Sequence, residues 1–141
     1  IFEDVEKGSK CCYLTDTGFV TETVRQAVEG AELLVLEANH DVEMLKNGRY
    51  PVLLKQRILS TRGHLSNDTA GWLLANMKEK PRRVFLAHLS EENNLPQLAL
   101  DTVQKVLKEA GQLNNIDILV ASQHEIVGDY LPVERSLFEN I

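Results

Sequence analysis

Short apolar runs alternate along the chain with stretches in which apolar residues recur every three or four positions. Continuous apolar runs at residues 33–37, 83–87 and 116–121 are typical of strands in a parallel sheet that is buried on both faces. Residues 10–15 form a fourth, β-leaning run that ends in the turn-prone sequence Asp16-Thr17-Gly18. We expect one further short strand or hairpin arm over residues 125–133.

The helical periodicity predicts segments that lie between these strands. Thr21 and Ser66 are candidate N-caps, Pro51 suits a first helical position, and Gly30 and Gly111 follow predicted helix ends. Strands separated by helices imply an α/β architecture. The predicted helices cover residues 21–28, 40–46, 51–59, 66–77 and 95–110, and the last of these has the clearest apolar stripe.

Length and composition fit one ordinary globular domain and exclude a disordered or collagen-like chain. The chain has 141 residues, of which 43% are hydrophobic and 26% are charged. It contains no apolar run of about 20 residues, which a membrane span needs, and its N-terminus does not resemble a signal peptide. Cys11 and Cys12 are adjacent, so in a strand their side chains point to opposite faces and do not pair. We therefore expect a reducing, cytoplasmic location.

The formal net charge of −6 bears on the possible partners. A dedicated nucleic-acid-binding module usually has a basic face, and this chain as a whole is acidic. A metal-dependent nuclease can nevertheless be acidic, because its carboxylates hold cations that meet phosphate. The sequence contains no P-loop, no G-x-G-x-x-G and no G-x-S-x-G motif.

Three side chains that can bind metal ions lie at the ends of the predicted strands. Asp16 follows the first strand, Glu37 ends the second, and His88 follows the third. The carboxyl ends of parallel strands meet at one edge of a sheet, and a metal site needs carboxylates and imidazoles gathered there. Each residue also has a structural interpretation: Asp16 suits a turn before Gly18, and His88 suits a hydrogen bond at the sheet edge. Glu37 could orient a nearby histidine by accepting its ring N–H.

A second candidate group lies in the sequence GHLSN at residues 63–67. His64 could act as a general acid toward a leaving group. Ser66 and Asn67 begin a predicted helix, and the N–H groups and dipole of a helix N-terminus favour phosphate. The alternative is a helix-entry loop with a surface histidine. His40 is a candidate supporting residue behind the site, or it caps the next helix together with Asp41.

The four motifs TDTG, LEANHD, GHLSN and AHLS occur in an order that resembles the C-terminal half of metallo-β-lactamase-fold hydrolases. Residues 37–51, EANHDVEMLKNGRYP, and residues 86–94, LAHLSEENN, are similar to the nuclease-like YycJ/WalJ group. The resemblance implies half of an αββα sandwich that holds two divalent ions, Zn²⁺ or Mn²⁺, between its sheets. It also implies a DNA substrate and a 5′-to-3′ exonuclease activity linked to repair in Gram-positive bacteria.

The same resemblance implies a role for each candidate residue. Asp16 matches the aspartate that bridges the two metal ions, and His88 matches the last metal-binding histidine. His64 resembles a histidine near the site that donates a proton or contacts phosphate, with Glu37 as its orienting carboxylate. Water activated between the metal ions attacks the phosphodiester in such enzymes.

The chain departs from the family pattern because the N-terminal motif H-x-H-x-D-H is missing. Only Asp16 and His88 remain of the metal ligands, and catalytic sites use three or more. We therefore expect residues 1–141 to be a partial fold in a single domain that binds metal weakly and is inactive alone. The first residue is not Met, which fits a truncated chain. Removing one sheet of a sandwich exposes an apolar face, so we expect self-association.

Two other functions fit the same sequence. One is a small-molecule metallo-hydrolase on this fold, acting on a thioester or a cyclic phosphodiester. The other is a non-catalytic domain for binding or dimerisation. A basic groove beside the site would favour nucleic acid, and it could use Arg49, Lys55, Arg57 and Arg62, which otherwise form a solvated helix face.

Overall fold

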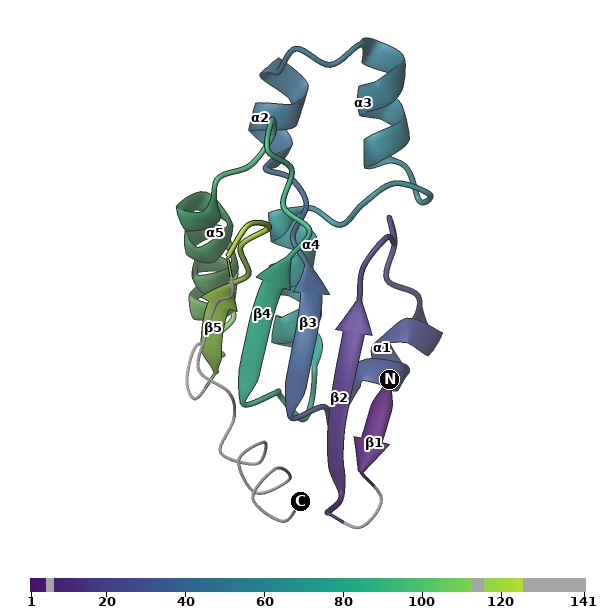
Figure 1. Ribbon diagram of the computed structural model, residues 1–141, viewed down its shortest axis with the longest axis vertical. Coiled ribbons are helices and arrows are strands. Elements are labelled where there is room, and N and C mark those ends of the chain that lie inside the picture. Colours follow the sequence, from purple (N-terminus) through teal and green to yellow (C-terminus); the bar gives the residue numbers. More distant parts are fainter. Residues whose placement is uncertain (5–6, 113–115, 126–141) are drawn as a thin grey trace.

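The fold is built on a single five-stranded sheet with the strand order β1-β2-β3-β4-β5 (Figure 1). The computed structural model describes residues 1–4, 7–112 and 116–125. Strand β1 pairs antiparallel with β2, and each later strand is parallel to its neighbour. The strands are β1 (Phe2–Asp4), β2 (Ser9–Leu14), β3 (Leu33–Glu37), β4 (Arg83–Ala87) and β5 (Asp117–Val120).

Helices connect the parallel strands, which confirms the expected α/β architecture. Thr21 and Ser66 are N-caps as predicted, because their side chains accept hydrogen bonds from Val24 N and Thr69 N. None of the helices in the described ranges is long and apolar enough to cross a membrane. The helices are α1 (Glu22–Val28), α2 (Val42–Asn47), α3 (Val52–Leu59), α4 (Asn67–Asn76) and α5 (Pro96–Glu109).

Four details differ from the sequence-based expectation. Strand β1 was not predicted, since three residues are too short to show a pattern. Pro51 is the N-cap of α3 and not its first helical residue. Asp41 alone caps α2, by accepting from Met44 N. Trp72, a large apolar residue within the helix predicted over residues 66–77, is 58% exposed. The arm expected over residues 125–133 lies almost wholly outside the described residues.

One face of the sheet packs against α1, α4 and α5 and forms the core. The strand residues on this face alternate with those on the other face, as the two-residue period of a strand requires. In the view of Figure 1, α4 lies behind the strands. The core cluster includes Cys12, Leu34, Leu36, Val84 and Leu86 from the strands and Val28, Leu74, Val103 and Leu107 from the helices.

No described helix covers the other face of the sheet. Tyr13, Val35, Phe85 and Leu119 form one row across it, because each is paired with the next in register. Tyr13 is 60% exposed, and the other three are only partly buried. The described part of the chain therefore has the uncovered apolar face that is expected of one half of a sandwich.

Candidate metal centre

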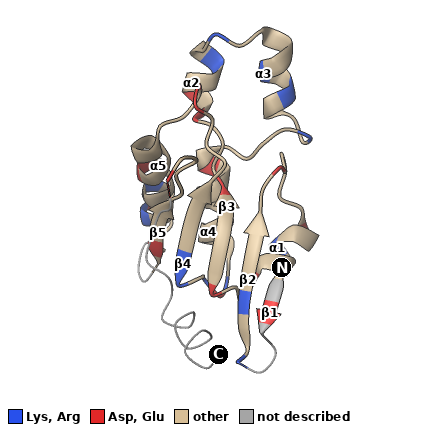
Figure 2. Ribbon diagram, viewed as in Figure 1, with Lys and Arg blue, Asp and Glu red and all other residues tan. Residues whose placement is uncertain are grey.

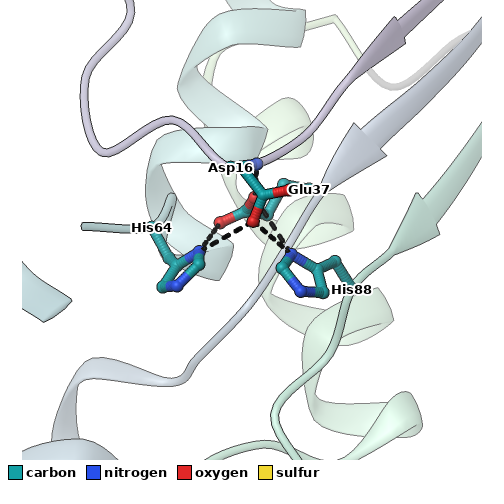
Figure 3. Close-up of side chains that lie close together, drawn as sticks. All are labelled: Asp16, Glu37, His64 and His88. Atoms are coloured by element: carbon teal, nitrogen blue, oxygen red, sulfur yellow. Dashed lines mark hydrogen bonds and ion pairs between the residues drawn. The ribbon is translucent and has the colours of Figure 1, made fainter. Parts of the chain in front are cut away.

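The carboxyl ends of β2, β3 and β4 bring four side chains together (Figure 3). Asp16 lies in the loop after β2, Glu37 is the last residue of β3, and His88 directly follows β4. His64 comes from the loop between α3 and α4. Each residue offers one ligand atom, and these four atoms all lie within 4.8 Å of one another. The structure thus gathers the four residues to which the sequence analysis assigned metal-binding or catalytic roles.

Glu37 is the centre of this cluster and is completely buried. Its Oε1 lies 2.9 Å from Nδ1 of His64, and its Oε2 lies 3.3 Å from Nδ1 of His88. Oε1 also accepts from Leu65 N at 3.0 Å, and Oε2 accepts from Asp16 N. With a hydrogen on Nδ1 of each ring, ring and backbone N–H groups satisfy both oxygens, which is what a buried carboxylate needs. A carboxylate that accepts both Nδ1–H groups leaves Nε2 of each ring free to act elsewhere.

The two expected metal ligands, Asp16 and His88, have unusual backbone conformations. Their φ angles are 57° and 58°, and among the described residues other than glycine only these two have a positive φ. Asp and His tolerate this left-handed region better than most residues, but it remains sparsely populated. Each residue lies in the turn that follows a strand, where the backbone N–H of Asp16 donates to Glu37 and the ring of His88 faces the same carboxylate. Asp16 Oδ1 then lies 3.5 Å from Nδ1 of His88.

His64 is held in place by the way its loop packs against α3 and the loop after β2. Its backbone N–H donates to Ile58 O at 3.1 Å. A Cβ added at Gly63 would lie 1.9 Å from Ile58 O, so only glycine fits before this histidine. The missing side chain thus makes room for the backbone of α3. Gly18 is equally crowded: a Cβ there would lie 2.3 Å from Ser60 O.

His40, expected behind the site, is buried, with 1% of its surface exposed. Its Nδ1 lies 3.3 Å from Asn39 Oδ1, and its Nε2 has no hydrogen-bond partner among the described residues. The pKa of His40 is lowered from 6.5 to about 4, mainly by burial and also by nearby His64, while Asp41 acts in the opposite direction. His40 therefore lies close to the cluster as a neutral imidazole and is not one of the four clustered donors.

The expected phosphate contacts, Ser66 and Asn67, are engaged in local structure. The Ser66 hydroxyl accepts from Thr69 N at 3.1 Å as the cap of α4. The side chain of Asn67 is buried and exchanges two hydrogen bonds with Asn94, at 2.8 and 2.9 Å. These contacts fix the helix to the loop after β4, and this geometry does not favour phosphate binding by either side chain.

Sequence reasoning did not identify the part played by Asn39. Its side-chain amide donates to the backbone carbonyl of His88 at 2.9 Å, and its backbone N–H donates to Leu65 O at 2.9 Å. Asn39 thereby joins the loops that follow β3 and β4 and supports the position of His88. An amide residue two positions after a buried strand gives no recognisable pattern, so only the structure reveals this contact.

The donor set fits a divalent transition-metal ion. Two carboxylates and two imidazoles suit Zn²⁺ and Mn²⁺. Nδ1 of each ring faces the carboxylate oxygens at distances of 2.9, 3.3, 3.5 and 3.9 Å, so rings held through Nδ1 keep Nε2 as their donor atom for an ion. Asp16 and His88 are also partly exposed, with 72% and 42% of their side chains accessible, so an ion can reach them.

Residues 1–89 match the family described as the Beta-lactamase superfamily domain. The chain belongs to this superfamily, as the resemblance implied. Two curated relatives narrow the comparison further. The chain is 44% identical over 103 residues to exodeoxyribonuclease YycJ of Bacillus anthracis, which covers 72% of this chain and 39% of the relative. It is 44% identical over 108 residues to exodeoxyribonuclease WalJ of Streptococcus pneumoniae, which covers 76% of this chain and 40% of the relative.

The resemblance to the YycJ/WalJ group is therefore confirmed, and the matched region spans about two fifths of the length of these relatives. A solved structure described as a new diphosphatase from the PhnP family aligns with 87% of this chain and 36% of that chain. Its sequence identity is 15% and its TM-score is 0.47.

Proposed function

We propose that this chain forms the C-terminal part of a metal-dependent phosphodiesterase that removes nucleotides from DNA in the 5′-to-3′ direction. The observation that carries the proposal is the cluster of Asp16, Glu37, His64 and His88 at one edge of the sheet. Two relatives that are 44% identical over most of this chain are named exodeoxyribonucleases, which supports DNA as the substrate.

Asp16 and His88 are the proposed metal ligands, and the ions are Zn²⁺ or Mn²⁺. The carboxylate of Asp16 has two oxygens, and each can hold one ion. Glu37 accepts Nδ1–H of His88, which directs Nε2 of that ring toward a metal ion and makes it a better ligand. Bound divalent ions supply a Lewis acid for the phosphoryl oxygen and lower the pKa of a coordinated water.

His64 is the proposed proton donor to the leaving oxygen. Its Nδ1 is 2.9 Å from Glu37 Oε1 and 3.9 Å from Asp16 Oδ1, so two carboxylates compensate the positive charge of a protonated ring. The hydrogen bond to buried Glu37 fixes the ring orientation, and Nε2 is then the atom from which a proton is transferred.

The remaining ligands come, on this proposal, from an N-terminal part that carries the H-x-H-x-D-H motif. Glu37 lies on the same face of β3 as Val35, because alternate residues of a strand share a face. The cluster therefore adjoins the uncovered face of the sheet, where a second sheet would bring further side chains. Alone, this chain would hold metal weakly and would not hydrolyse DNA.

The test is to fuse the N-terminal part of the Bacillus anthracis relative to this chain and to measure metal content and hydrolysis of end-labelled DNA. We expect near-stoichiometric metal and exonuclease activity, both of which are lost in Asp16→Ala and His88→Ala. The matched control is His124→Ala, since His124 is exposed and its ring lies 3.3 Å from Glu91, outside the cluster. A fusion that folds and retains metal in both site variants would overturn the proposal.

A further inference from the structure

A basic segment adjoins the candidate metal centre in an otherwise acidic chain. Residues 44–62, here called the basic arm, contain five cationic side chains and no acidic one, although the whole chain has a net charge of −6. Figure 2 shows blue but no red along α3 and the turn that follows it. The five cations are Lys46, Arg49, Lys55, Arg57 and Arg62.

Three of these five cations are engaged by the protein itself. Lys46 lies 3.7 Å from Glu43, and Arg49 lies 2.7 Å from Glu92. Lys55 Nζ donates to the carbonyl oxygens of Lys46 and Gly48, at 2.7 Å each, and so joins α3 to the end of α2. Arg57 and Arg62 are exposed, and neither guanidinium has an ion pair or hydrogen bond within the described part of the chain. Two cations on the arm are thus available to a partner.

Helix α3 of the basic arm does not contribute to the buried core. Helices α2 and α3 stand beyond the carboxyl ends of the strands (Figure 1), and α3 has no buried residue. Val52 and Leu53 on α3 are 68% and 80% exposed. A helix that buries so little contributes little to the core, so its position is better explained by contact with a partner.

The end of the arm is fixed to the loops of the metal centre. The turn at residues 60–63 packs against Gly18, because a Cβ there would lie 2.3 Å from Ser60 O and 2.5 Å from Gly63 N. Arg62 is in this turn, two residues before His64 and on the loop that contacts the Asp16 loop. Arg57 lies in the last turn of α3, whose carbonyl at Ile58 accepts from His64 N. The backbone that carries Arg57 and Arg62 is therefore fixed to the loops of the site.

We propose that the basic arm binds the sugar–phosphate backbone of the DNA strand whose end enters the metal centre, with Arg57 and Arg62 contacting phosphates beyond the scissile one. The inference rests on the proposed function, and it names the residues that would favour a DNA strand over a small-molecule substrate. A small substrate without a phosphate beyond the reacting group would leave both guanidinium groups without a partner. Arginine suits phosphate because its planar fork donates two parallel hydrogen bonds.

The test measures binding of this 141-residue chain to a fluorescent single-stranded oligonucleotide of about 12 nucleotides, a length within the usual site sizes. Fluorescence anisotropy is recorded in EDTA at several salt concentrations, so that neither metal nor catalysis is involved. The double variant Arg57→Ala/Arg62→Ala is compared with Lys105→Ala/Lys108→Ala, which removes two exposed cations from α5. Circular dichroism confirms that all three proteins are folded.

We expect the arm variant to bind about tenfold more weakly and its log–log salt slope to fall by about 1.4, since each lost phosphate contact on a single strand contributes about 0.7. The α5 variant should bind like the parent chain. Equal weakening in both variants, or no binding by the parent chain, would overturn the inference. The proposed function is tested separately: a fusion protein that binds DNA through the arm but does not hydrolyse it would contradict only the catalytic proposal.

Discussion

Glu37 and His64 are 27 positions apart in the sequence, yet Oε1 of the buried carboxylate lies 2.9 Å from Nδ1 of the ring. The same carboxylate oxygen accepts from the backbone of the next residue, Leu65, so it fixes the ring and the loop that carries it. On its other side Glu37 contacts His88 and the backbone of Asp16. One buried side chain therefore sets the relative positions of the other three donors.

Replacing Glu37 with glutamine should weaken metal binding without removing a proposed ligand. The amide keeps the size of the side chain, but its NH₂ group cannot accept a ring N–H, so at least one histidine loses its orientation. We expect Mn²⁺ or Zn²⁺ affinity in the fusion protein to fall by about 10- to 100-fold, measured by isothermal titration calorimetry.

The matched control for this change is Glu91→Gln, because Glu91 is an exposed carboxylate 3.3 Å from the ring of His124. The metal affinity of the Glu91→Gln fusion protein should equal that of the parent fusion protein. If the isolated chain already binds one ion stoichiometrically and Glu37→Gln abolishes that binding, Glu37 is itself a ligand and not an orienting residue. Unchanged affinity in Glu37→Gln would contradict both assignments.

His40 should make the folded state less stable as the pH falls from about 6.5 to about 4. Burial, reinforced by His64, lowers its pKa to about 4 in the folded chain, whereas the unfolded chain keeps the ordinary value of 6.5. Between these values the unfolded state binds a proton that the folded state does not, so protonation favours unfolding. The loss approaches about 3 kcal/mol at the low end of the window and then stops increasing.

The measurement for His40 is urea unfolding at pH 7 and pH 4.5 in the parent chain and in His40→Gln. The variant removes this titration, so its free energy of unfolding should change by about 2 kcal/mol less between the two pH values. The comparison is a difference within each protein, so it holds even if the variant is less stable at pH 7. An equal change in both proteins would show that His40 titrates normally.

The order of strands and helices was predictable because the apolar pattern reflects burial directly. The runs at residues 33–37 and 83–87 became β3 and β4 with the expected bounds, and Ser66 capped its helix as expected. The exposure of Trp72 was not predictable, since helical spacing alone does not reveal which side of α4 meets the core. Strand β1 was missed because it depends on pairing with β2, a contact that local sequence does not encode.

The residues of the candidate site could be predicted from the sequence, but the hydrogen bonds between them could not. The strand-end positions of Asp16 and His88 were enough to place both at one edge of a parallel sheet. Burial of the Glu37 carboxylate between two rings and two backbone N–H groups depends on loops that meet only in the fold. The hydrogen bonds between Asn67 and Asn94 also depend on loops that meet only in the fold, so the sequence could not show that the Asn67 side chain is already engaged.

Gly63→Ala should destabilise the chain and displace His64. The new Cβ would lie 1.9 Å from Ile58 O and 2.5 Å from Arg57 O, both of which are backbone atoms that cannot move independently. We expect a loss of about 2–3 kcal/mol in the free energy of unfolding, typical of overpacking, and a shifted imidazole NMR signal for His64. Gly111→Ala is the control: its φ is 69° but a Cβ there meets nothing within 4 Å. That control should cost only about 1–2 kcal/mol and leave the His64 signal unchanged.

The isolated chain should self-associate through the uncovered face of its sheet. Tyr13, Val35 and Phe85 lie in one row on that face, and among the described residues no helix shields them. Burying such a row against a second copy removes apolar surface from water at about 25 cal/mol per Å². We expect a dimer or larger species in sedimentation velocity experiments at micromolar concentration, and a monomer for Val35→Lys/Phe85→Lys.

Trp72→Lys is the control for this last prediction, because Trp72 is the large exposed aromatic of α4. If the Trp72 variant dissociates while the sheet-face variant does not, the contact lies on the helical side and the sheet face is not the interface. If the parent chain is a monomer that unfolds cooperatively, the sheet face is stable while exposed to water and the prediction of self-association is wrong. In the fusion protein, the proposed second sheet covers the row of Tyr13, Val35 and Phe85, so a fusion with the parent sequence should sediment as a monomer. The Val35→Lys/Phe85→Lys variant should lower the melting temperature of the fusion protein.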